Sequence, residues 1–361
     1  MRIGIDAREM CGRRTGAGRY LGGLLREWAA GERTGRHELI VYAPEPIDVA
    51  LDAGRCAMRV VPGSPGSWWE QVRLPPIAAA DRLDVFFAPA YTAPLRLEVP
   101  TVVAIHDLSF VAHPEWFRLS EGVRRRWLTR ESARRASAIV TISEFSRREL
   151  IDRWGVADSR VHVIPPGITP PGTDLDGGPR EERVLFVGSM FNRRHVPDLV
   201  RSFAAVARVR PGASLDLVGD NRTHPREDLE RIIASERLAD RVRWHRYVSD
   251  DDLGRLYASA RAFAFLSEYE GLGLTPLEAL AAGVPPVVVD TPVARESCAG
   301  AALYVPLVDL AATSRAIERV LVDESTRTRV LAAAPAALAK YSWPRAAEET
   351  LALIERAGSG R

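Results

Sequence analysis

The chain has 361 residues, a length typical of two domains, and 46% of its residues are hydrophobic. This composition, with 7% aromatic residues, excludes a disordered chain, and the 27 glycines and 25 prolines follow no collagen-like period. The formal charge is only +2, so the chain lacks the general basic field of a nucleic-acid-binding protein. Lys340 is the only lysine among the 49 basic residues.

The three cysteines, Cys11, Cys56 and Cys298, are an odd number and have no metal-binding spacing. They therefore argue against a disulfide framework and a structural zinc site, and a reducing compartment is expected. No apolar run approaches the roughly 20 residues that span a bilayer. The opening residues 1–6 are too short and too quickly charged for a signal peptide, so the sequence predicts a soluble, cytoplasmic protein.

Short β-branched segments alternate with longer helical ones, a pattern typical of parallel sheets wrapped by helices. The strands expected in the first half are 3–5, 38–42, 85–87, 101–105, 138–141 and 161–164, and the helices are 19–30, 120–136 and 144–153. After a Pro/Gly-rich segment, strands are expected at 184–187, 214–218, 242–245, 262–266 and 287–289. The helices expected there are 197–209, 226–236, 251–260, 276–282 and a final one at 342–356.

The segment 165–179 can continue neither a helix nor a central strand, and so marks a linker. The predicted fold is α/β, with two doubly wound Rossmann-like lobes. The domains are residues 1–166 and 181–341, joined by a linker at 167–180. Because ligands of such sheets bind at the carboxyl ends of the strands, the inter-domain cleft is the expected site.

The most informative segment is 265–289, where a strand leads into a glycine-rich loop and a helix opens near Pro276. Glu270 lies in the loop and Glu278 follows eight residues later, just inside the helix. Backbone N–H groups and the helix dipole at this position favour a diphosphate. The two flanking carboxylates are better suited to accept hydrogen bonds from sugar or ribose hydroxyls.

In this context, Glu270 and Glu278 resemble the E-x7-E signature of the family-4 retaining glycosyltransferases, which have the two-lobe GT-B fold. The resemblance implies that Glu270 contacts the transferred sugar of a nucleotide-sugar donor and that Glu278 binds its ribose. Residues 271–274 would then surround the sugar and phosphate. It also implies a C-terminal crossover helix, 342–361, that packs back on the N-terminal domain.

The segment 184–195 resembles the family's strand, glycine and basic pair, which neutralises the departing diphosphate. Arg193 and Arg194 occupy that pair, but the second position is usually Lys, and His195 stands where Gly or Asn is commoner. Ser189 stands where many relatives carry another Arg. Because a guanidinium is planar and bulkier than an ammonium, whether Arg194 fully replaces the lysine stays open.

A hydrophobic segment ends in His106 and Asp107, where a side chain faces the cleft. The family places a His here beside the sugar ring, and the neighbouring residues 108–116 resemble its mannosyltransferase-like branch. Asp107 either orients His106 or caps the next segment. Glycines in 15–20 resemble the N-terminal loop near the diphosphate and acceptor, and 247–250 resembles the loop that contacts the base.

Two groups of site residues are therefore expected. The catalytic ones are His106, Arg193, Arg194 and Glu270. The donor-binding ones are Gly16, Gly18, Gly188, Ser189, Val248, Gly271, Leu272, Gly273, Leu274 and Glu278. No metal motif is visible in the sequence, and no cofactor is expected beside the donor substrate.

The resemblance implies a metal-independent hexosyltransferase that retains the anomeric configuration. It favours transfer of mannose from GDP-mannose to an acceptor hydroxyl in glycan, polysaccharide or glycoconjugate biosynthesis. The acceptor is a glycan, a lipid-linked molecule or a small molecule. A UDP- or dTDP-sugar donor with a natural-product acceptor is an alternative. From other classes, a nucleotide-sugar epimerase and a non-catalytic sugar-nucleotide binder stay open.

Two further segments have two interpretations each. Residues 124–127, with Arg130, Arg134 and Arg135, form either a basic helix that rests on anionic lipid at the inner face of the membrane or a solvated helix face. Residues 67–71, which include two tryptophans, either line an acceptor groove or pack against the first domain.

Overall fold

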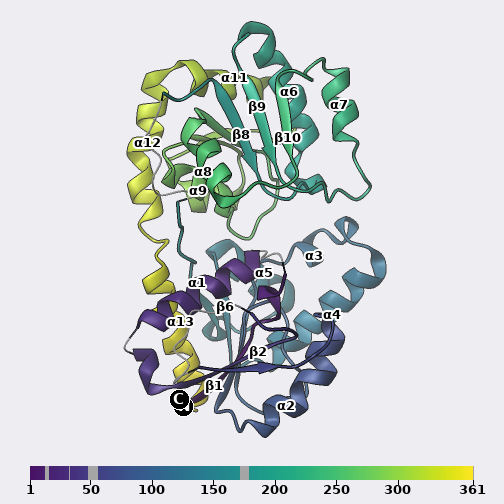
Figure 1. The fold of residues 1–361 in the computed structure, drawn as a ribbon, viewed down its shortest axis with the longest axis vertical. Coiled ribbons are helices and arrows are strands. Elements are labelled where there is room, and N and C mark those ends of the chain that lie inside the picture. The colour runs from purple at the N-terminus through teal and green to yellow at the C-terminus, as the bar shows by residue number, and fades with distance from the viewer. Residues whose placement is uncertain (13–15, 32, 48–55, 171–178, 361) are drawn as a thin grey trace. The chain divides into compact units, whose positions relative to one another are not determined.

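The computed structural model describes residues 1–12, 16–31, 33–47, 56–170 and 179–360. They form two compact units (Figure 1). We call residues 1–167 with 341–361 the N-terminal domain and residues 168–340 the C-terminal domain. Thr15 of the predicted glycine loop and 171–178 of the predicted linker lie outside the described residues.

The N-terminal domain contains a seven-stranded, wholly parallel sheet in the order β3-β2-β1-β4-β5-β6-β7. The strands are β1 (Arg2–Asp6), β2 (Glu38–Ala43), β3 (Cys56–Val60), β4 (Val85–Ala88), β5 (Thr101–Ala104), β6 (Ala138–Thr141) and β7 (Val161–Val163). The order reverses between β1 and β4. Such a reversal opens a crevice at the carboxyl ends of the strands, where ligands of this architecture bind.

Alternate residues of these strands build a separate core on each face of the sheet. In β2, Leu39 and Val41 belong to the core under α1 (Gly16–Ala30) and α13 (Trp343–Gly358). Ile40 and Tyr42 belong to the opposite core. That second face is covered by α2 (Leu74–Ala80), α3 (Ser109–Ala112), α4 (Leu119–Arg135) and α5 (Glu144–Trp154).

The final helix, α13, completes the N-terminal domain and packs beside α1 (Figure 1). Ser342 caps its start, and the Trp28 indole nitrogen donates a hydrogen bond to the Ala347 carbonyl at 2.9 Å. The Trp343 ring lies directly against Gly23 and Gly167, where an added Cβ would come within 2.3 and 2.2 Å of it. Gly23 therefore permits the close approach of α1 and α13, and Gly167 permits that of α13 and the segment after β7.

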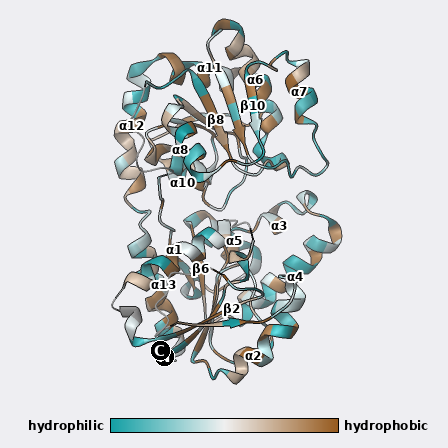
Figure 2. Ribbon diagram, in the orientation of Figure 1, coloured by the Kyte–Doolittle hydropathy of each residue, from teal (hydrophilic) through white to brown (hydrophobic). Residues whose placement is uncertain are grey.

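The C-terminal domain has a six-stranded parallel sheet in the order β10-β9-β8-β11-β12-β13. The strands are β8 (Arg183–Val187), β9 (Ser214–Val218), β10 (Val242–His245), β11 (Ala262–Phe265), β12 (Pro286–Val289) and β13 (Leu303–Val305). The helices are α6 (Val196–Val209), α7 (Leu229–Ser235), α8 (Asp250–Ser259), α9 (Leu274–Ala281), α10 (Pro292–Cys298), α11 (Leu310–Val322) and α12 (Glu324–Leu338). The strands are hydrophobic and lie between the layers of helices (Figure 2). Here the order reverses between β8 and β11.

Every strand and helix expected from the sequence is present, with ends that shift by a few residues. The predicted start of the first helix at Arg19 is wrong, because Gly16 and Gly18 belong to the first turn of α1 instead of a loop. α7 begins three residues later than predicted because Asp228 caps it, accepting a hydrogen bond from the Arg231 N–H at 3.0 Å.

Several elements were not expected from the sequence. β3 is an edge strand with three of five residues exposed, so it lacks an apolar run. Also unexpected are α2, α3, and the elements between 290 and 341, which are β13 and α10–α12. Among the described helices, none is both long and apolar enough to cross a bilayer.

The contact between Gly23 and Trp343 generates a prediction about stability. Substitution Gly23→Ala should destabilise the protein by about 1–3 kcal/mol, because the new methyl group must displace the indole ring. The control is Gly16→Ala on the same helix, where an added Cβ meets nothing within 4 Å and only the gain in helix propensity acts. Urea unfolding followed by circular dichroism measures both. Equal effects of the two substitutions would contradict the packing argument.

Candidate active site

The largest group of predicted site residues lies at the strand-order reversal of the C-terminal domain. The loop after β8 contains Gly188 and the Arg193–Arg194 pair, and the loop after β11 contains Glu270. Since β8 and β11 are adjacent and parallel, both loops leave the same edge of the sheet. A backbone hydrogen bond from the Glu268 N–H to the Arg193 carbonyl, 3.0 Å, ties them together.

Glu270 and Arg194 form an ion pair with little exposure to solvent. The Arg194 Nε donates to Glu270 Oε1 at 2.8 Å, and only 14% and 15% of the two side chains are exposed. One Arg194 terminal nitrogen donates to the Ser189 carbonyl at 2.8 Å. Ser267 Oγ donates to the same Glu270 oxygen at 2.9 Å. The carboxylate is therefore held in one orientation from two sides.

The charge state of Glu270 follows from these contacts. Burial alone would raise its pKa, but the Arg194 and Arg193 guanidiniums and the hydrogen bonds from Arg194 and Ser267 bring the pKa below its ordinary value. Glu270 is thus an ionised hydrogen-bond acceptor at neutral pH.

Arg193 lies at the same point but is held differently. Its Nε donates to the Tyr269 carbonyl at 3.2 Å, and a terminal nitrogen lies 4.0 Å from Glu270 Oε2. Its guanidinium stacks over Phe191 at 4.5 Å, while that of Arg194 lies 5.0 Å from the Phe265 ring. Two cations consequently share one carboxylate, which leaves local positive charge for an anionic ligand.

Glycines let the loop after β8 approach its neighbours. Gly188 has φ +142°, and an added Cβ would lie 2.6 Å from the terminal nitrogen of Arg194. Gly219, at the end of β9, has φ +139°, and its Cβ would lie 2.2 Å from the Gly188 carbonyl oxygen. Gly219 was not among the residues expected at the site, although its position directly after an expected strand was the available signal.

The glycine-rich loop ends at the N-terminus of α9. Gly273 precedes the helix with φ +82°, a left-handed conformation that favours glycine. The first turn therefore offers N–H groups without intrahelical partners. Within the described chain, the buried Thr275 hydroxyl in this turn has no hydrogen-bond partner, and the E-x7-E pattern did not single it out. Glu278 follows in the next turn and is half-buried.

The other residues predicted to bind the donor differ in how deeply they are buried. Gly271 and Leu272 are buried, and Gly273 and Leu274 are half-buried. Val248 follows β10 at the same edge of the sheet, and its side chain packs against the hydrophobic core. The neighbouring Tyr247 is 70% exposed. The structure brings these residues to one edge of the sheet, and their individual roles stay predictions.

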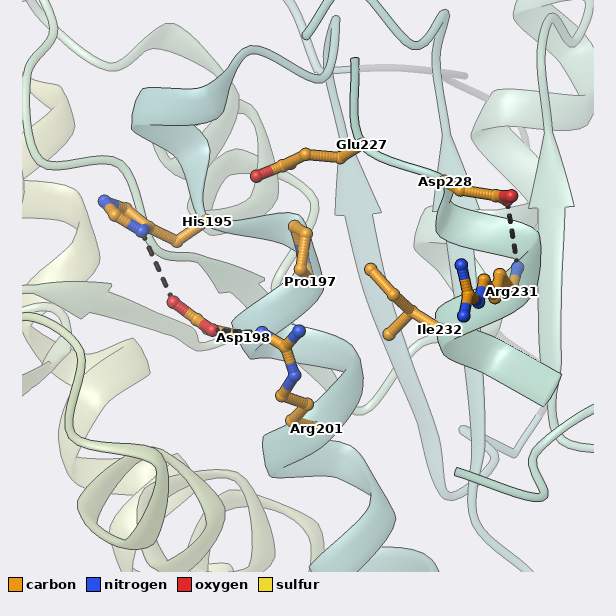
Figure 3. A pocket seen from close by; sticks show the side chains of 8 residues that line it. All are labelled: His195, Pro197, Asp198, Arg201, Glu227, Asp228, Arg231 and Ile232. Atoms are coloured by element: carbon orange, nitrogen blue, oxygen red, sulfur yellow. Dashed lines mark hydrogen bonds and ion pairs between the residues drawn. The ribbon is translucent and has the colours of Figure 1, made fainter. Parts of the chain in front are cut away.

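His195 is one of the residues that depart from the family pattern. Its backbone is left-handed, with φ +47°, a conformation that Gly and Asn adopt readily. Its imidazole lies 3.4 Å from Asp198 and 3.3 Å from Glu268. A cavity of about 300 Å³ opens beside it, walled by α6 and the start of α7 (Figure 3). None of the predicted donor residues lines this cavity.

In the N-terminal domain, His106 follows β5 and is 8% exposed. Its Nε2 lies 2.8 Å from the Pro89 carbonyl, which can only accept, so Nε2 carries a proton. The rings of Tyr20 and Tyr91 meet it edge-on at 4.9 and 5.5 Å. Burial lowers the pKa of His106 below its ordinary value, which keeps the imidazole neutral at pH 7.

Asp107 caps the next segment, one of its two predicted roles. Its carboxylate accepts hydrogen bonds from the Ser109 backbone N–H at 2.8 Å and the Tyr91 hydroxyl at 2.6 Å. Burial would raise the pKa of Asp107, but hydrogen bonds from the Ser109 side chain, the Tyr91 hydroxyl and the Ser109 N–H, together with the Arg125 charge, lower it below its ordinary value. Asp107 therefore fixes the loop that carries His106.

The segment 67–71 was expected either to line an acceptor groove or to pack against the first domain, and its residues differ in burial. Trp69 is buried and donates to the Val61 carbonyl at 2.7 Å, whereas Trp68 is 61% exposed. Glu70 is fully buried and lies 2.8 Å from Arg8, beside the end of β1. Most of the segment thus packs within the domain.

No group of three or more His, Cys, Asp or Glu residues in the described ranges is placed to hold a metal ion.

Two protein-family models match the chain, one in each half. The model of the family described as Glycosyltransferase Family 4 matches residues 14–170, and that described as Glycosyl transferases group 1 matches residues 177–336. Together they cover most of the chain.

Curated relatives are glycosyltransferases of modest identity. O-antigen chain mannosyltransferase B of Escherichia coli is 28% identical over 74% of this chain and 73% of its own length. An MMP alpha-(1->4)-mannosyltransferase of Mycolicibacterium hassiacum is 27% identical over 68% of this chain and 61% of its own length. A D-inositol 3-phosphate glycosyltransferase of Kineococcus radiotolerans is 28% identical over 74% of this chain and 68% of its own length.

Solved structures share the fold. Sucrose-phosphate synthase of Thermosynechococcus elongatus superposes with a TM-score of 0.78 at 19% identity, covering 100% of both chains. Anabaena HepE, solved with UDP and glucose, gives 0.75 at 18% identity over 98% of this chain and 99% of its own. The two parallel-sheet domains, the two matching family models and these structural neighbours identify a glycosyltransferase with the GT-B fold. The chain belongs to glycosyltransferase family 4, in its mannosyltransferase-like branch.

The ion pair at the site predicts a pH-dependent stability. Arg194→Met leaves the buried Glu270 without its main cation, so the carboxyl pKa in the folded variant rises above its unfolded value of about 4.3. The resulting loss is small where the carboxyl is protonated in both states, grows as pH rises from the unfolded pKa to the folded pKa, and is constant above it. We expect it to reach about 2–4 kcal/mol at pH 7.5.

Urea unfolding at pH 4.5 and 7.5 measures this loss. The double variant R194M/E270Q, which removes the buried charge, should recover most of the stability at pH 7.5. A loss that is equal at both pH values, or unchanged in the double variant, would contradict the assignment.

Proposed function

We propose that the protein transfers a hexose from a nucleoside-diphosphate sugar to an acceptor hydroxyl, with retention of the anomeric configuration. The observation that carries this proposal is the Arg193–Arg194–Glu270 group at the N-terminus of α9. It combines cations, helix N–H groups and an ionised carboxylate at one sheet edge, which suits a diphosphate joined to a sugar.

The arginines suit the leaving diphosphate. Arg194 uses Nε for Glu270 and one terminal nitrogen for the Ser189 carbonyl, so its other terminal nitrogen is left for a phosphate oxygen. When the bond between the anomeric carbon and the diphosphate breaks, negative charge grows on the departing oxygens. Preorganised cations and N–H groups stabilise that charge more strongly in the transition state than in the bound donor.

The reaction then needs no protein nucleophile. The acceptor oxygen bonds to the anomeric carbon on the face that the diphosphate leaves, and the acceptor proton passes to the diphosphate. Glu270 would orient the sugar through its hydroxyls and Glu278 would bind the ribose. His106, neutral and held by Pro89, would lie beside the sugar ring.

We favour GDP-mannose as the donor, with no further cofactor and no metal. The mannosyltransferases among the relatives support the sugar. A UDP- or dTDP-sugar with a small-molecule acceptor is a second candidate. The relative named D-inositol 3-phosphate glycosyltransferase supports a small-molecule acceptor, and the Anabaena HepE structure with UDP-glucose supports a UDP-sugar. A glycan or a lipid-linked acceptor fits the first candidate, in which GDP-mannose is the donor.

A panel of sugar nucleotides tests the donor. Thermal shift and release of nucleoside diphosphate are measured for GDP-mannose and for UDP- and dTDP-sugars. GDP-mannose should give the largest shift and, with acceptor, the fastest release. Conversion of the donor to a new sugar nucleotide without acceptor would identify an epimerase instead, and stabilisation without any release would identify a non-catalytic binder. Proton NMR of the product's anomeric centre distinguishes retention from inversion.

The two glutamates predict separable losses of affinity. Glu278→Ala should weaken both the donor and the bare nucleotide by about tenfold or more, because each loses charge-assisted ribose hydrogen bonds. Glu270→Ala should weaken chiefly the sugar-bearing donor. Calorimetric titration measures both, with Glu268→Gln in the same loop as the control, which should bind like wild type. Unchanged binding and turnover in both alanine variants would show that the site lies elsewhere.

A further inference from the structure

The helix α4 exposes an apolar stripe on its solvent face. Leu119, Val123 and Trp127 are 81%, 51% and 59% exposed. They are spaced four residues apart, so they lie above one another on one side of the helix. Three large apolar side chains in a row on the outer face of a helix are unusual, because each keeps apolar surface in water.

This stripe is not the face that packs on the domain. The buried residues of α4 are Gly122, Leu128, Thr129, Ser132 and Ala133. By helical spacing, these lie along a different side of the helix from the stripe, and Ala133 belongs to the core under the sheet. The side chains of Leu119, Val123 and Trp127 are therefore not required for the fold.

Arginines surround the stripe. Arg118, Arg124 and Arg130 are exposed, and no ion pair or hydrogen bond of their side chains occurs in the described parts of the chain. Arg130 follows Trp127 by three residues and so continues the same face. Farther along, Arg134 and Arg135 both pair with Glu131, at 3.0 and 3.6 Å. The face thus carries excess positive charge around an apolar centre.

We propose that α4 rests on an anionic lipid surface, with Leu119, Val123 and Trp127 in the headgroup region and the unpaired arginines on lipid phosphates. Charge complementarity favours this occupant, since arginines without partners repel a second copy of the same face. Tryptophan at such a position is typical of membrane interfaces. The contact is peripheral and reversible, because three side chains supply little buried area and need the electrostatic attraction as a second contribution.

The inference is independent of the proposed function. It depends on one helix of the N-terminal domain (Figure 1), whereas Arg193, Arg194 and Glu270, which are proposed to bind the donor, lie in the C-terminal domain. Donor binding measured by thermal shift is therefore a control for folding in every variant below. Loss of vesicle binding with normal donor binding concerns only this inference.

Flotation of the full chain with vesicles tests the proposal. The wild type should float with vesicles of 70% phosphatidylcholine and 30% phosphatidylglycerol, and not with pure phosphatidylcholine. Salt at 0.5 M should release it. L119S/W127S should lower the partition coefficient by at least about tenfold. R124E/R130E should lower it by more than about twentyfold, since each basic residue near the surface contributes roughly fivefold.

The matched control is R208E/R329E. Both arginines are exposed, lie on helices of the C-terminal domain and change the net charge by the same amount. This variant should float like wild type. The proposal is overturned if the wild type does not bind anionic vesicles, or if the control loses as much vesicle binding as R124E/R130E. It also fails if sedimentation without vesicles shows a dimer that L119S/W127S abolishes, because the stripe is then an interface between copies.

Discussion

The buried ion pair between Arg194 and Glu270 is the interaction on which the candidate site depends. Either charge alone would be costly at 14–15% exposure, and together they fix the loops after β8 and β11 against each other. The pair also sets the chemistry, because it keeps Glu270 ionised and holds Arg194 beside the loop that leads into helix α9. Structure and reactivity thus arise from the same contact.

Both domains place their polar groups where the strand order reverses. In the N-terminal domain this point lies between β1 and β4, and Arg8 joins Asp6 and Glu70 there in a buried cluster. Burial, with the nearby Glu70 charge, raises the pKa of Asp6 to about 6, although Arg8 opposes the shift. Parallel sheets leave a crevice at such a reversal, so charged loops gather there in each half of the chain.

Much of this arrangement could be predicted from the sequence, because periodicity and glycine-rich loops are local signals. The edge strand β3 and the elements after residue 290 could not, since their packing partners are distant and their own apolar patterns are weak. The pairing of Arg194 with Glu270 was also hidden, as 76 residues separate them. Gly219 and the left-handed His195 matter through backbone contacts and dihedral angles, which motif spacing does not show.

A crystal structure of the protein with its sugar nucleotide would show directly where the donor binds. We expect the pyrophosphate between Arg193, Arg194 and the first turn of α9, the ribose on Glu278, and the hexose hydroxyls on Glu270. A ligand bound elsewhere, for example in the charged cavity beside His195 with the arginine–glutamate pair untouched, would contradict it.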